Sequence, residues 1–260
     1  MLFTASLLTA CAAPTARNNQ FAADHGFKRT EILGAGFTHV VYQSGHDTNT
    51  DARWHVYIEG DGKPWIANKF VAADPTIAKP LMLRLMSSDT NPAIYLGRPC
   101  YLGMKDTPPC TPLHWTHQRY SKQVVASMVA VLQQLITEHK IRNLSLFGHS
   151  GGGTLAMLMA NQIPQTRSIV TLAGNLDIRA WSHRHGYSPL THSLNPAEQP
   201  PLPASVRQLH YASRNDNNIP PEIIKPVVKH QLNAEFIILE EPDHHCCWQR
   251  YWPAILQKLE

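Results

Sequence analysis

Residues 143–159 read NLSLFGHSGGGTLAMLM: an apolar segment, a serine flanked by glycines, and a run of small residues. The apolar residues before the serine have the continuous hydrophobic character of a strand buried on both faces, and the residues from Thr154 onward have helical composition. Ser150 therefore lies at a sharp turn from a strand into a helix. Glycines two residues to either side, Gly148 and Gly152, remove Cβ atoms that would otherwise collide in such a turn. We expect the turn to present the Ser150 hydroxyl and not to bury it.

Residues 148–152 also form the pattern G-x-S-x-G, and the whole stretch resembles the nucleophile elbow of the α/β-hydrolase superfamily. The first amides of the helix that follows are unpaired and point back at the serine, so the Gly151 N–H is placed to receive a developing oxyanion. The resemblance covers about residues 37–260 and is closest to uncharacterised bacterial hydrolase-like lipoproteins. It implies an α/β fold with a mostly parallel central sheet and helices on both faces. A tight loop without function is the alternative for the bare pattern.

Length and composition fit this fold class. The chain has 260 residues, of which 43% are hydrophobic, enough to bury one large core in a single domain. Charged residues make up 16% of the chain, and the formal net charge is +4 with histidines neutral. This positive excess is too small and too scattered to indicate a nucleic-acid-binding surface. Beyond the N-terminus, no apolar run approaches the length of a membrane-spanning helix.

The N-terminal residues 1–11, MLFTASLLTAC, are apolar and small and end in a segment similar to the lipobox of bacterial lipoproteins. In a lipobox, cleavage leaves the cysteine, here Cys11, as a lipid-modified N-terminus. No Lys or Arg precedes the apolar run, although export signals normally begin with a basic stretch, and a start codon further upstream would explain this. We expect a polar tether and lead-in over residues 12–35, the folded domain over residues 36–260, and a lipid-anchored, periplasm-facing location in the bacterial envelope. A frayed N-terminus with a chance cysteine is the alternative.

The other cysteines fit an oxidising compartment. Cys100 and Cys110 flank a loop rich in glycine and proline, which a local disulfide could close. Cys246 and Cys247 are adjacent, and with that pairing they either form a vicinal ring or stay as thiols.

Two early strands are expected over residues 37–43 and 54–59, separated by a turn cluster and forming a hairpin that opens the sheet. The second strand runs into Glu59-Gly60-Asp61-Gly62. In α/β-hydrolases the corresponding loop supplies the second oxyanion amide, often from a His-Gly-Gly motif. The similarity is one of position, so the inward amide is that of Asp61, which we assign, or that of Gly62. A plain turn is the alternative.

The remaining elements follow from apolar periodicity. Helices are expected over residues 77–87, 120–140 and 221–231 and from about residue 247, and strands over 93–96, 168–172, 206–211 and 235–240. Residues 173–203 have little periodicity and are long for a loop, so we interpret them as a lid-like insertion over the site. Trp181, His183, His185 and Tyr187 are the substrate-facing candidates there, although a surface histidine is the commoner case.

An acid and a base follow two late strands. Asp216 comes shortly after the strand at 206–211 and resembles the triad acid of the superfamily; Asp177, after an earlier strand, is the alternative. His244 and His245 both follow the last strand, and adjacent side chains point in roughly opposite directions. We assign His244, which lies in the loop directly after Asp243, and expect His245 at the surface. Serine, acid and histidine then occur in the order found in α/β-hydrolases.

Together the motifs predict a serine hydrolase, similar to a carboxylesterase in its chemistry, that acts on a small acyl compound without a cofactor. Ser150 would attack the acyl carbonyl, His244 would take its proton, Asp216 would hold the imidazole, and the amides of Gly151 and Asp61 would bind the oxyanion. No H-E-x-x-H motif occurs, and the adjacent residues 244–247 cannot easily all face one metal ion.

Two rivals to ester hydrolysis remain open. The first is acyl transfer or peptide cleavage on the same scaffold. The second is an envelope-anchored binding protein with a hydrolase fold and no turnover, since a fold does not by itself define a function. We expect no nucleic-acid partner and no obligate protein partner.

Overall fold

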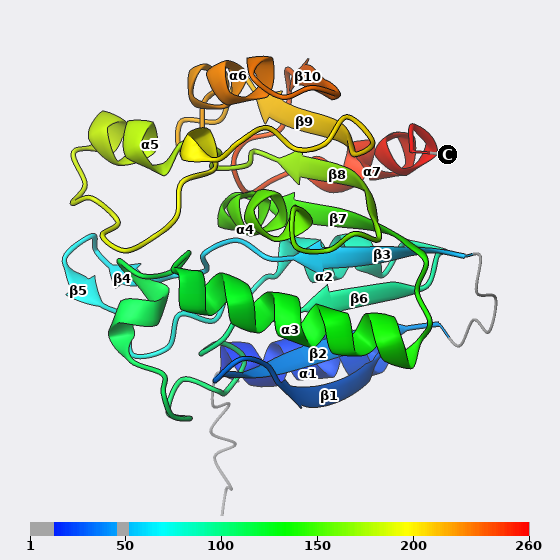
Figure 1. Cartoon of the computed structure of the whole chain (residues 1–260). Helices are drawn as coiled ribbons and strands as arrows, with labels where there is room; N and C mark the ends of the chain where they lie inside the picture. The colour runs from blue at the N-terminus through cyan, green and yellow to red at the C-terminus, as the bar shows by residue number, and fades with distance from the viewer. Residues whose placement is uncertain (1–12, 46–51, 260) are drawn as a thin grey trace, which may run out of the picture.

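A central sheet in the order β1-β2-β6-β3-β7-β8-β9-β10 organises the computed structural model, which describes residues 13–45 and 52–259 (Figure 1). Cys11 and the segment similar to a lipobox lie outside the described residues. The strands of this sheet are β1 (Lys28–Leu33), β2 (Thr38–Ser44), β3 (Arg53–Ile58), β6 (Ala93–Leu96), β7 (Asn143–His149), β8 (Thr166–Leu172), β9 (Arg207–Ser213) and β10 (Ala234–Leu239). From β6 to β10 every neighbouring pair is parallel, whereas β2 is antiparallel to both β1 and β6. The sheet is therefore mostly parallel, as expected.

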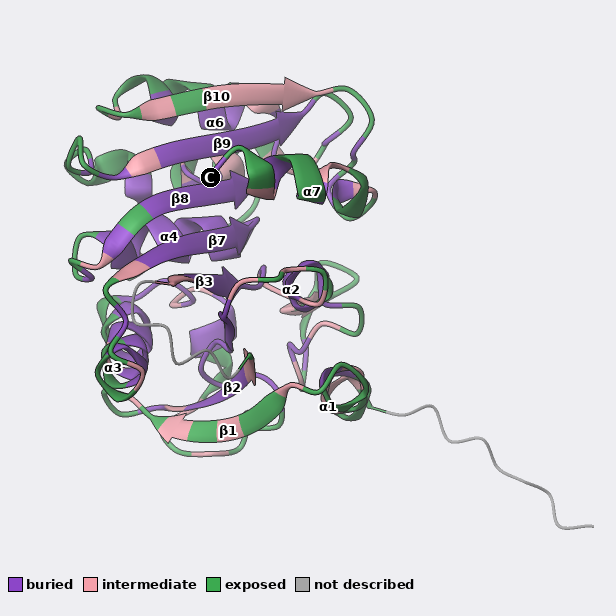
Figure 2. Cartoon of the chain, turned by 90° about the vertical axis from the view of Figure 1, so that its right-hand side faces the viewer, coloured by how far each residue is buried: buried purple, intermediate pink, exposed green. Residues whose placement is uncertain are grey.

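Helices cover both faces of the sheet (Figure 2). On one face lie α3 (Lys122–Glu138), α4 (Gly151–Ala160) and α6 (Pro221–Lys229), and on the other lie α1 (Pro14–Asp24), α2 (Leu81–Met86) and α7 (Trp248–Gln257). Every residue of α4 is buried, because α4 packs on β7 and β8 and beneath α3. The strand β7 is buried from its second residue to its last, which is the pattern of a central parallel strand. The turn between β7 and α4 thus lies at the centre of the molecule.

The prediction that the first two strands pair with each other as a hairpin is wrong. The strands at 37–43 and 54–59 exist as β2 and β3, but β6 is inserted between them and pairs with both. The antiparallel partner of β2 is β1, which a tight turn joins to it, with the Gly34 amide bonded to the Phe37 carbonyl at 2.8 Å. Every residue of β1 is exposed or half-buried, so its sequence, KRTEIL, carries no clear apolar alternation. An edge strand of this kind leaves little signal in a sequence.

The expected tether over residues 12–35 is also wrong, because most of it is folded. The helix α1 begins at Pro14, a residue suited to the first helical position, and β1 follows it. Asn18 and Ala22 are buried, and the Asn18 side-chain amide donates to the Ile77 carbonyl at 3.0 Å. These contacts attach α1 to the domain.

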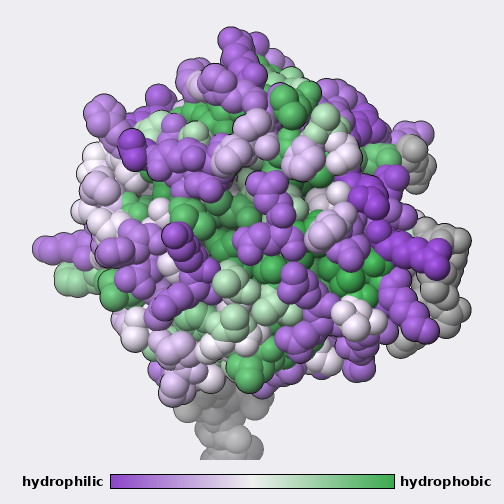
Figure 3. Space-filling model, viewed as in Figure 1, coloured by the Kyte–Doolittle hydropathy of each residue, from purple (hydrophilic) through white to green (hydrophobic). Residues whose placement is uncertain are grey.

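The segment expected as a lid lies between β8 and β9 and contains the helix α5 (Ile178–His185) and a 3-10 turn, η2 (Pro196–Glu198). A second excursion, after β3, forms the small hairpin β4 (Trp65–Ile66) and β5 (Phe70–Val71). Its side chains Ile66, Phe70 and Val71 are exposed, and Figure 3 shows an apolar patch at the left edge, where Figure 1 places this hairpin. Another 3-10 turn, η1 (Pro112–Trp115), precedes α3. No helix among the described residues has the length and apolar character needed to cross a membrane.

The packing of α1 predicts how two neighbouring substitutions differ. Ala22 is 1% exposed, whereas Ala23 is exposed on the same helix. Ala22→Asp buries an unpaired charge and should lower the free energy of unfolding by roughly 2 kcal/mol or more, and Ala23→Asp should change it by less than about 0.5 kcal/mol. Urea unfolding of both variants measures the difference. Equal stabilities would mean that residues 14–24 are a tether after all.

Candidate active site

The nucleophile candidate occupies a strained position that only its glycine neighbours permit. Ser150 caps the N-terminus of α4 with φ 53° and ψ −120°, outside the regions that L-residues normally adopt. A Cβ atom at Gly152 would lie 2.1 Å from the Ile58 carbonyl oxygen, and one at Gly148 would lie 2.3 Å from the Gly152 carbonyl oxygen. Close contacts therefore require both glycines, as expected from the sharpness of the turn. Strain of this kind persists only where the surrounding packing holds it.

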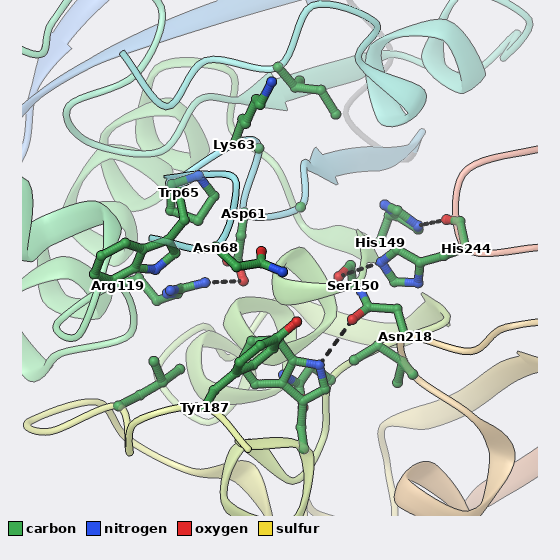
Figure 4. Close-up of a pocket in the computed structure, with 18 of the residues that line it drawn as sticks. Asp61, Lys63, Trp65, Asn68, Arg119, His149, Ser150, Tyr187, Asn218 and His244 are labelled. Carbon is green, nitrogen blue, oxygen red and sulfur yellow. Dashed lines mark hydrogen bonds and ion pairs between the residues drawn. The ribbon is translucent and has the colours of Figure 1, made fainter. Parts of the chain in front are cut away.

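Three side chains from separate loops meet at this turn, and Figure 4 shows two of them, Ser150 and His244. His244, in the loop after β10, places Nε2 3.0 Å from the Ser150 hydroxyl oxygen. Its Nδ1 lies 2.8 Å from a carboxylate oxygen of Asp216, in the loop after β9. The other Asp216 oxygen accepts hydrogen bonds from the amides of Asn218 and Ile219, both at 2.8 Å. With the Nδ1 proton donated to Asp216, Nε2 is left as an acceptor for the serine hydroxyl.

These three residues are more buried than the sequence suggested. Ser150 and His244 are each 8% exposed and Asp216 is 1% exposed, so the hydroxyl is reached only through a cavity. Burial alone would raise the pKa of Asp216, but the hydrogen bond to His244, the charge of His244 and two backbone amides outweigh it and hold the pKa below its usual value. Asp216 is thus a carboxylate at neutral pH, positioned to stabilise a positive imidazole.

The two alternative residues have other partners. Asp177 is the N-cap of α5, where one carboxylate oxygen accepts from the amides of Arg179 and Ala180 at 3.1 Å. His245 is exposed at the cavity, and its backbone amide donates to Asp243 at 2.7 Å. Among the described residues, neither Asp177 nor His245 has a side-chain hydrogen bond to Ser150 or His244.

The loop after β3 lies directly beside the serine. A Cβ atom at Gly60 would be 3.4 Å from the Cβ of Ser150, and one at Gly151 would be 2.1 Å from a carboxylate oxygen of Asp61. In the described part of the chain, neither the Asp61 amide nor the Gly151 amide donates a hydrogen bond. Two unpaired donors therefore stand near Ser150, one from the loop and one from the first turn of α4. Gly62 has a positive φ of 66°, and a Cβ atom there would lie 2.0 Å from the Pro75 carbonyl oxygen.

The side chain of Asp61 has a role that its sequence did not indicate. Its carboxylate accepts hydrogen bonds from the guanidiniums of Arg98 and Arg119, the latter at 2.9 Å, and from the Tyr120 hydroxyl at 2.6 and 2.7 Å. The Tyr101 hydroxyl donates to the Asp61 backbone carbonyl at 2.9 Å. Burial opposes ionisation, but the charges of Arg119 and Arg98 hold the pKa of Asp61 well below its usual range. We call these five residues the Asp61 cluster; it fixes both the side chain and the backbone of the loop.

The Asp61 cluster was not found from the sequence because its members are far apart in the chain. Arg98 follows β6, and Arg119 precedes α3, so no local motif links them to the glycine-rich loop. The only available signal was a charged residue between two glycines, which is common in turns.

A cavity of about 480 Å³ opens above Ser150. The insertion between β8 and β9 forms one wall with Trp181 and Tyr187, and the segment after β3 forms another with Lys63 and Trp65. Figure 4 labels Tyr187, Lys63 and Trp65 around the cavity. The indole N–H of Trp181 donates to the side-chain oxygen of Asn218 at 3.1 Å, so the insertion is attached to the loop that carries Asp216. The lid-like insertion thus contributes to the cavity, including two of the four side chains considered from the sequence. The rings of His185 and Tyr187 stack on each other with centroids 5.2 Å apart.

The structure contains two disulfides. Cys100 is bonded to Cys110, which is the pairing expected from the loop between them. Cys246 is bonded to Cys247, so the adjacent pair forms the vicinal ring and does not remain as thiols. The ring follows His245 directly and ends at the start of α7. In the described part of the chain, no group of three or more His, Cys, Asp or Glu side chains is arranged to hold a metal ion.

A second histidine lies beneath the site. His149 is buried, its Nε2 donates to the His244 backbone carbonyl at 2.8 Å, and burial lowers its pKa to about 3. Its Nδ1 is buried without a hydrogen-bond partner and lies 3.9 Å from a carboxyl oxygen of Glu59. Burial raises the pKa of Glu59 to about 7, although its oxygens accept from the amides of Met82 and Gly60. A proton on Glu59 at neutral pH would face the free lone pair of His149.

Comparison with known proteins identifies the fold family to which this architecture corresponds. No family model matches the sequence, and no curated protein does. Among solved structures, the chain is similar to an esterase of Pyrococcus furiosus, with a TM-score of 0.62 and 10% identity over 97% of this chain and 94% of that one. It is similar to a putative α/β hydrolase of Agrobacterium tumefaciens, with a TM-score of 0.57 and 11% identity over 89% and 94%. Puromycin hydrolase gives a TM-score of 0.60 and 15% identity over 87% of this chain and 37% of that one. The chain has the α/β-hydrolase fold.

The burial of Glu59 predicts a pH-dependent stability. Its pKa rises from an ordinary value of 4.5 to about 7 in the folded protein, so the folded state holds this proton more tightly than the unfolded state. The associated stability is complete below about pH 4.5 and is lost as the pH rises to about 7, a change on the order of 3 kcal/mol. Buried histidines such as His149 have an opposite pH dependence that the native protein and Glu59→Gln share. In urea unfolding, the free energy of unfolding of the native protein should therefore fall relative to that of Glu59→Gln as the pH rises from about 5 to about 7.5.

The exposed Glu222 on α6 provides the matched control, since Glu222→Gln should keep the slope of the native protein. A Glu59→Gln variant with an unchanged slope would show that Glu59 is ionised throughout this range.

Proposed function

We propose that this protein, which has the α/β-hydrolase fold, is a serine hydrolase that cleaves an acyl ester through an acyl-enzyme intermediate. One observation carries the proposal: the continuous hydrogen-bond chain from Ser150 through His244 to Asp216, at 3.0 and 2.8 Å, at the floor of a cavity. Nucleophile, base and orienting acid within hydrogen-bond reach are the arrangement that activates a serine. The similar structures are an esterase and hydrolases, which agrees with this chemistry, although their low identity carries only the fold.

The geometry supports the following sequence of steps. The Ser150 oxygen attacks the substrate carbonyl while its proton passes to Nε2 of His244, and Asp216 stabilises the resulting imidazolium. The carbonyl oxygen becomes an oxyanion that accepts from the amides of Gly151 and Asp61. The carbon–oxygen bond to the alcohol then breaks, and His244 gives its proton to the departing alcohol. A water molecule repeats the attack on the acyl-enzyme with His244 as the base, which releases the acid and restores Ser150.

The residues around the site favour this assignment over its alternatives within the chain. Asp177 is held by the amides of α5, which supports Asp216 as the acid. His244 Nε2, and not a ring nitrogen of His245, faces the Ser150 hydroxyl, which supports His244 as the base. The Asp61 amide is unpaired among the described residues and directly follows Gly60, which packs against Ser150, and this supports the Asp61 amide as the second oxyanion donor.

The rival functions differ from ester hydrolysis in the acyl acceptor, in the bond that is cleaved, or in the absence of turnover. An acyltransferase would use the same residues but would pass the acyl group to an alcohol or amine in preference to water, and a peptidase would cleave an amide. A binding protein without turnover would need neither the aligned His244 nor the strained Ser150 backbone, and that strain costs stability. The strain therefore favours an enzyme over a binder.

We also propose that the protein acts in the bacterial cell envelope, anchored through a lipid on Cys11. The disulfides Cys100–Cys110 and Cys246–Cys247 support an oxidising compartment, because disulfides persist mainly outside the reducing cytosol. Cys11 lies outside the described residues, so the anchor rests on the sequence alone.

The two adjacent histidines provide the test. With an activated aryl ester, His244→Ala should lower kcat by up to roughly 10⁶-fold, as for the base of a comparable triad, whereas His245→Ala should change it by less than about tenfold. Initial rates under saturating substrate measure both variants, and Ser150→Ala, which removes only the hydroxyl, should match the loss in His244→Ala. Survival of activity in His244→Ala with loss in His245→Ala would transfer the base to His245, and survival in Ser150→Ala would remove the nucleophile.

A further inference from the structure

The guanidinium of Arg119 forms part of the wall of the cavity that contains Ser150. Arg119 is 3% exposed, its Nε donates to the Thr116 carbonyl at 2.6 Å, and one terminal nitrogen donates to Asp61 at 2.9 Å. The other terminal nitrogen has no hydrogen-bond partner among the described residues. It is not one of the fully buried side-chain atoms that lack a partner, so it remains accessible from the cavity. A guanidinium has five N–H donors, so Arg119 presents unused donors to the cavity.

The charge of this wall is positive. The Asp61 cluster holds two guanidiniums, Arg98 and Arg119, against one carboxylate, and burial raises the pKa of both Tyr101 and Tyr120, so these phenols stay neutral. Asp61 is the only acidic side chain among the described residues that line the cavity, and Lys63 adds a further positive charge at its exposed edge. Within the Asp61 cluster, two buried guanidiniums face a single carboxylate. The Glu59 carboxyl also interacts with Arg98, but burial raises its pKa to about 7, so it offsets that charge only in part at neutral pH. The remaining positive charge is costly unless an anion joins it.

This positive wall is close to the reacting centre. The Asp61 carboxylate, which bonds directly to Arg119, is in contact with Gly151, the residue after the nucleophile. An anion that pairs with Arg119 would therefore lie only a short spacer away from a carbonyl carbon at Ser150.

We propose that the substrate is an ester that carries a carboxylate near the scissile bond, and that Arg119 binds this carboxylate. The inference rests on the proposed hydrolase function and names the substrate class of the same site. A substrate carboxylate on Arg119 brings the cluster to two guanidiniums and two carboxylates, which balances the charge within the cluster. Arginine suits this role because its planar fork matches the geometry of a carboxylate.

Matched substrate pairs test the proposal in the native protein. Ethyl hydrogen succinate and ethyl succinamate differ only in a carboxylate against an amide on the acyl side, and 4-acetoxybenzoate and 4-acetoxybenzamide differ in the same way on the leaving-group side. Each enzymatic kcat/KM is divided by the alkaline hydrolysis rate of the same ester, which removes differences in intrinsic reactivity. In at least one pair the carboxylate should raise this ratio by roughly tenfold or more, as a charge-assisted pair would.

Variants then identify the residue responsible. Arg119→Gln should abolish the preference for the anionic partner, Arg119→Lys should retain part of it, and Lys63→Gln should reduce it slightly. Because the readout is a ratio between two substrates, a general loss of activity from disturbing Asp61 cancels. Lys225 is exposed on α6 and does not line the cavity, so Lys225→Gln is the control for net charge and should leave the ratio unchanged.

The outcomes separate this proposal from the one on which it rests. Hydrolysis of the neutral esters at rates equal to or above those of the anionic ones, in both pairs, would overturn the anionic substrate and leave the hydrolase intact. An anionic preference that survives Arg119→Gln would also overturn the assignment of Arg119. Hydrolysis of none of the four esters, together with no hydrolysis of an activated aryl ester, would overturn the proposed function itself.

Discussion

The close approach of the backbone at the β7–α4 turn is the constraint on which the rest of the site depends. Gly148 and Gly152 allow the chain to reverse within van der Waals contact of β3, and Ser150 is held between them at a positive φ. The strand and the helix that impose this geometry are both buried, so the strain is maintained by the core of the molecule. The loops that carry Asp216 and His244 end neighbouring parallel strands, and they reach the turn because parallel strands bring their carboxyl ends to one edge of the sheet.

Electrostatic organisation of the site comes from the Asp61 cluster. A glycine-rich loop alone would be mobile, but here the carboxylate of Asp61 is tied to Arg98, Arg119 and Tyr120 and its carbonyl is tied to Tyr101. Preorganised donors stabilise a developing charge without the cost of reorienting them during the reaction. The same cluster places a net positive charge against the cavity wall. Positioning of the oxyanion loop and selection of an anionic substrate would thus arise from one set of contacts.

The sequence revealed those parts of the fold and the site that leave a local signal. The apolar runs of β3, β6, β7, β8 and β9 and the amphipathic α3 were recognisable, as were the residues Ser150, Asp216 and His244, which the structure brings together. The strand order was not recoverable, because the insertion of β6 between β2 and β3 depends on pairing between distant segments. The exposed edge strand β1 and the helix α1 could not be predicted, since neither has a strong apolar period. The contacts of Arg98 and Arg119 with Asp61 exist only in the folded chain.

Covalent labelling tests most directly whether Ser150 is a nucleophile activated by His244. A fluorophosphonate reacts with a serine only when the serine is activated, and the adduct can be located by peptide mapping. We predict stoichiometric modification at Ser150 within minutes at neutral pH, and loss of the label when His244 is replaced by alanine. A folded protein that stays unmodified, or one that is modified at a different serine, would contradict this role for Ser150.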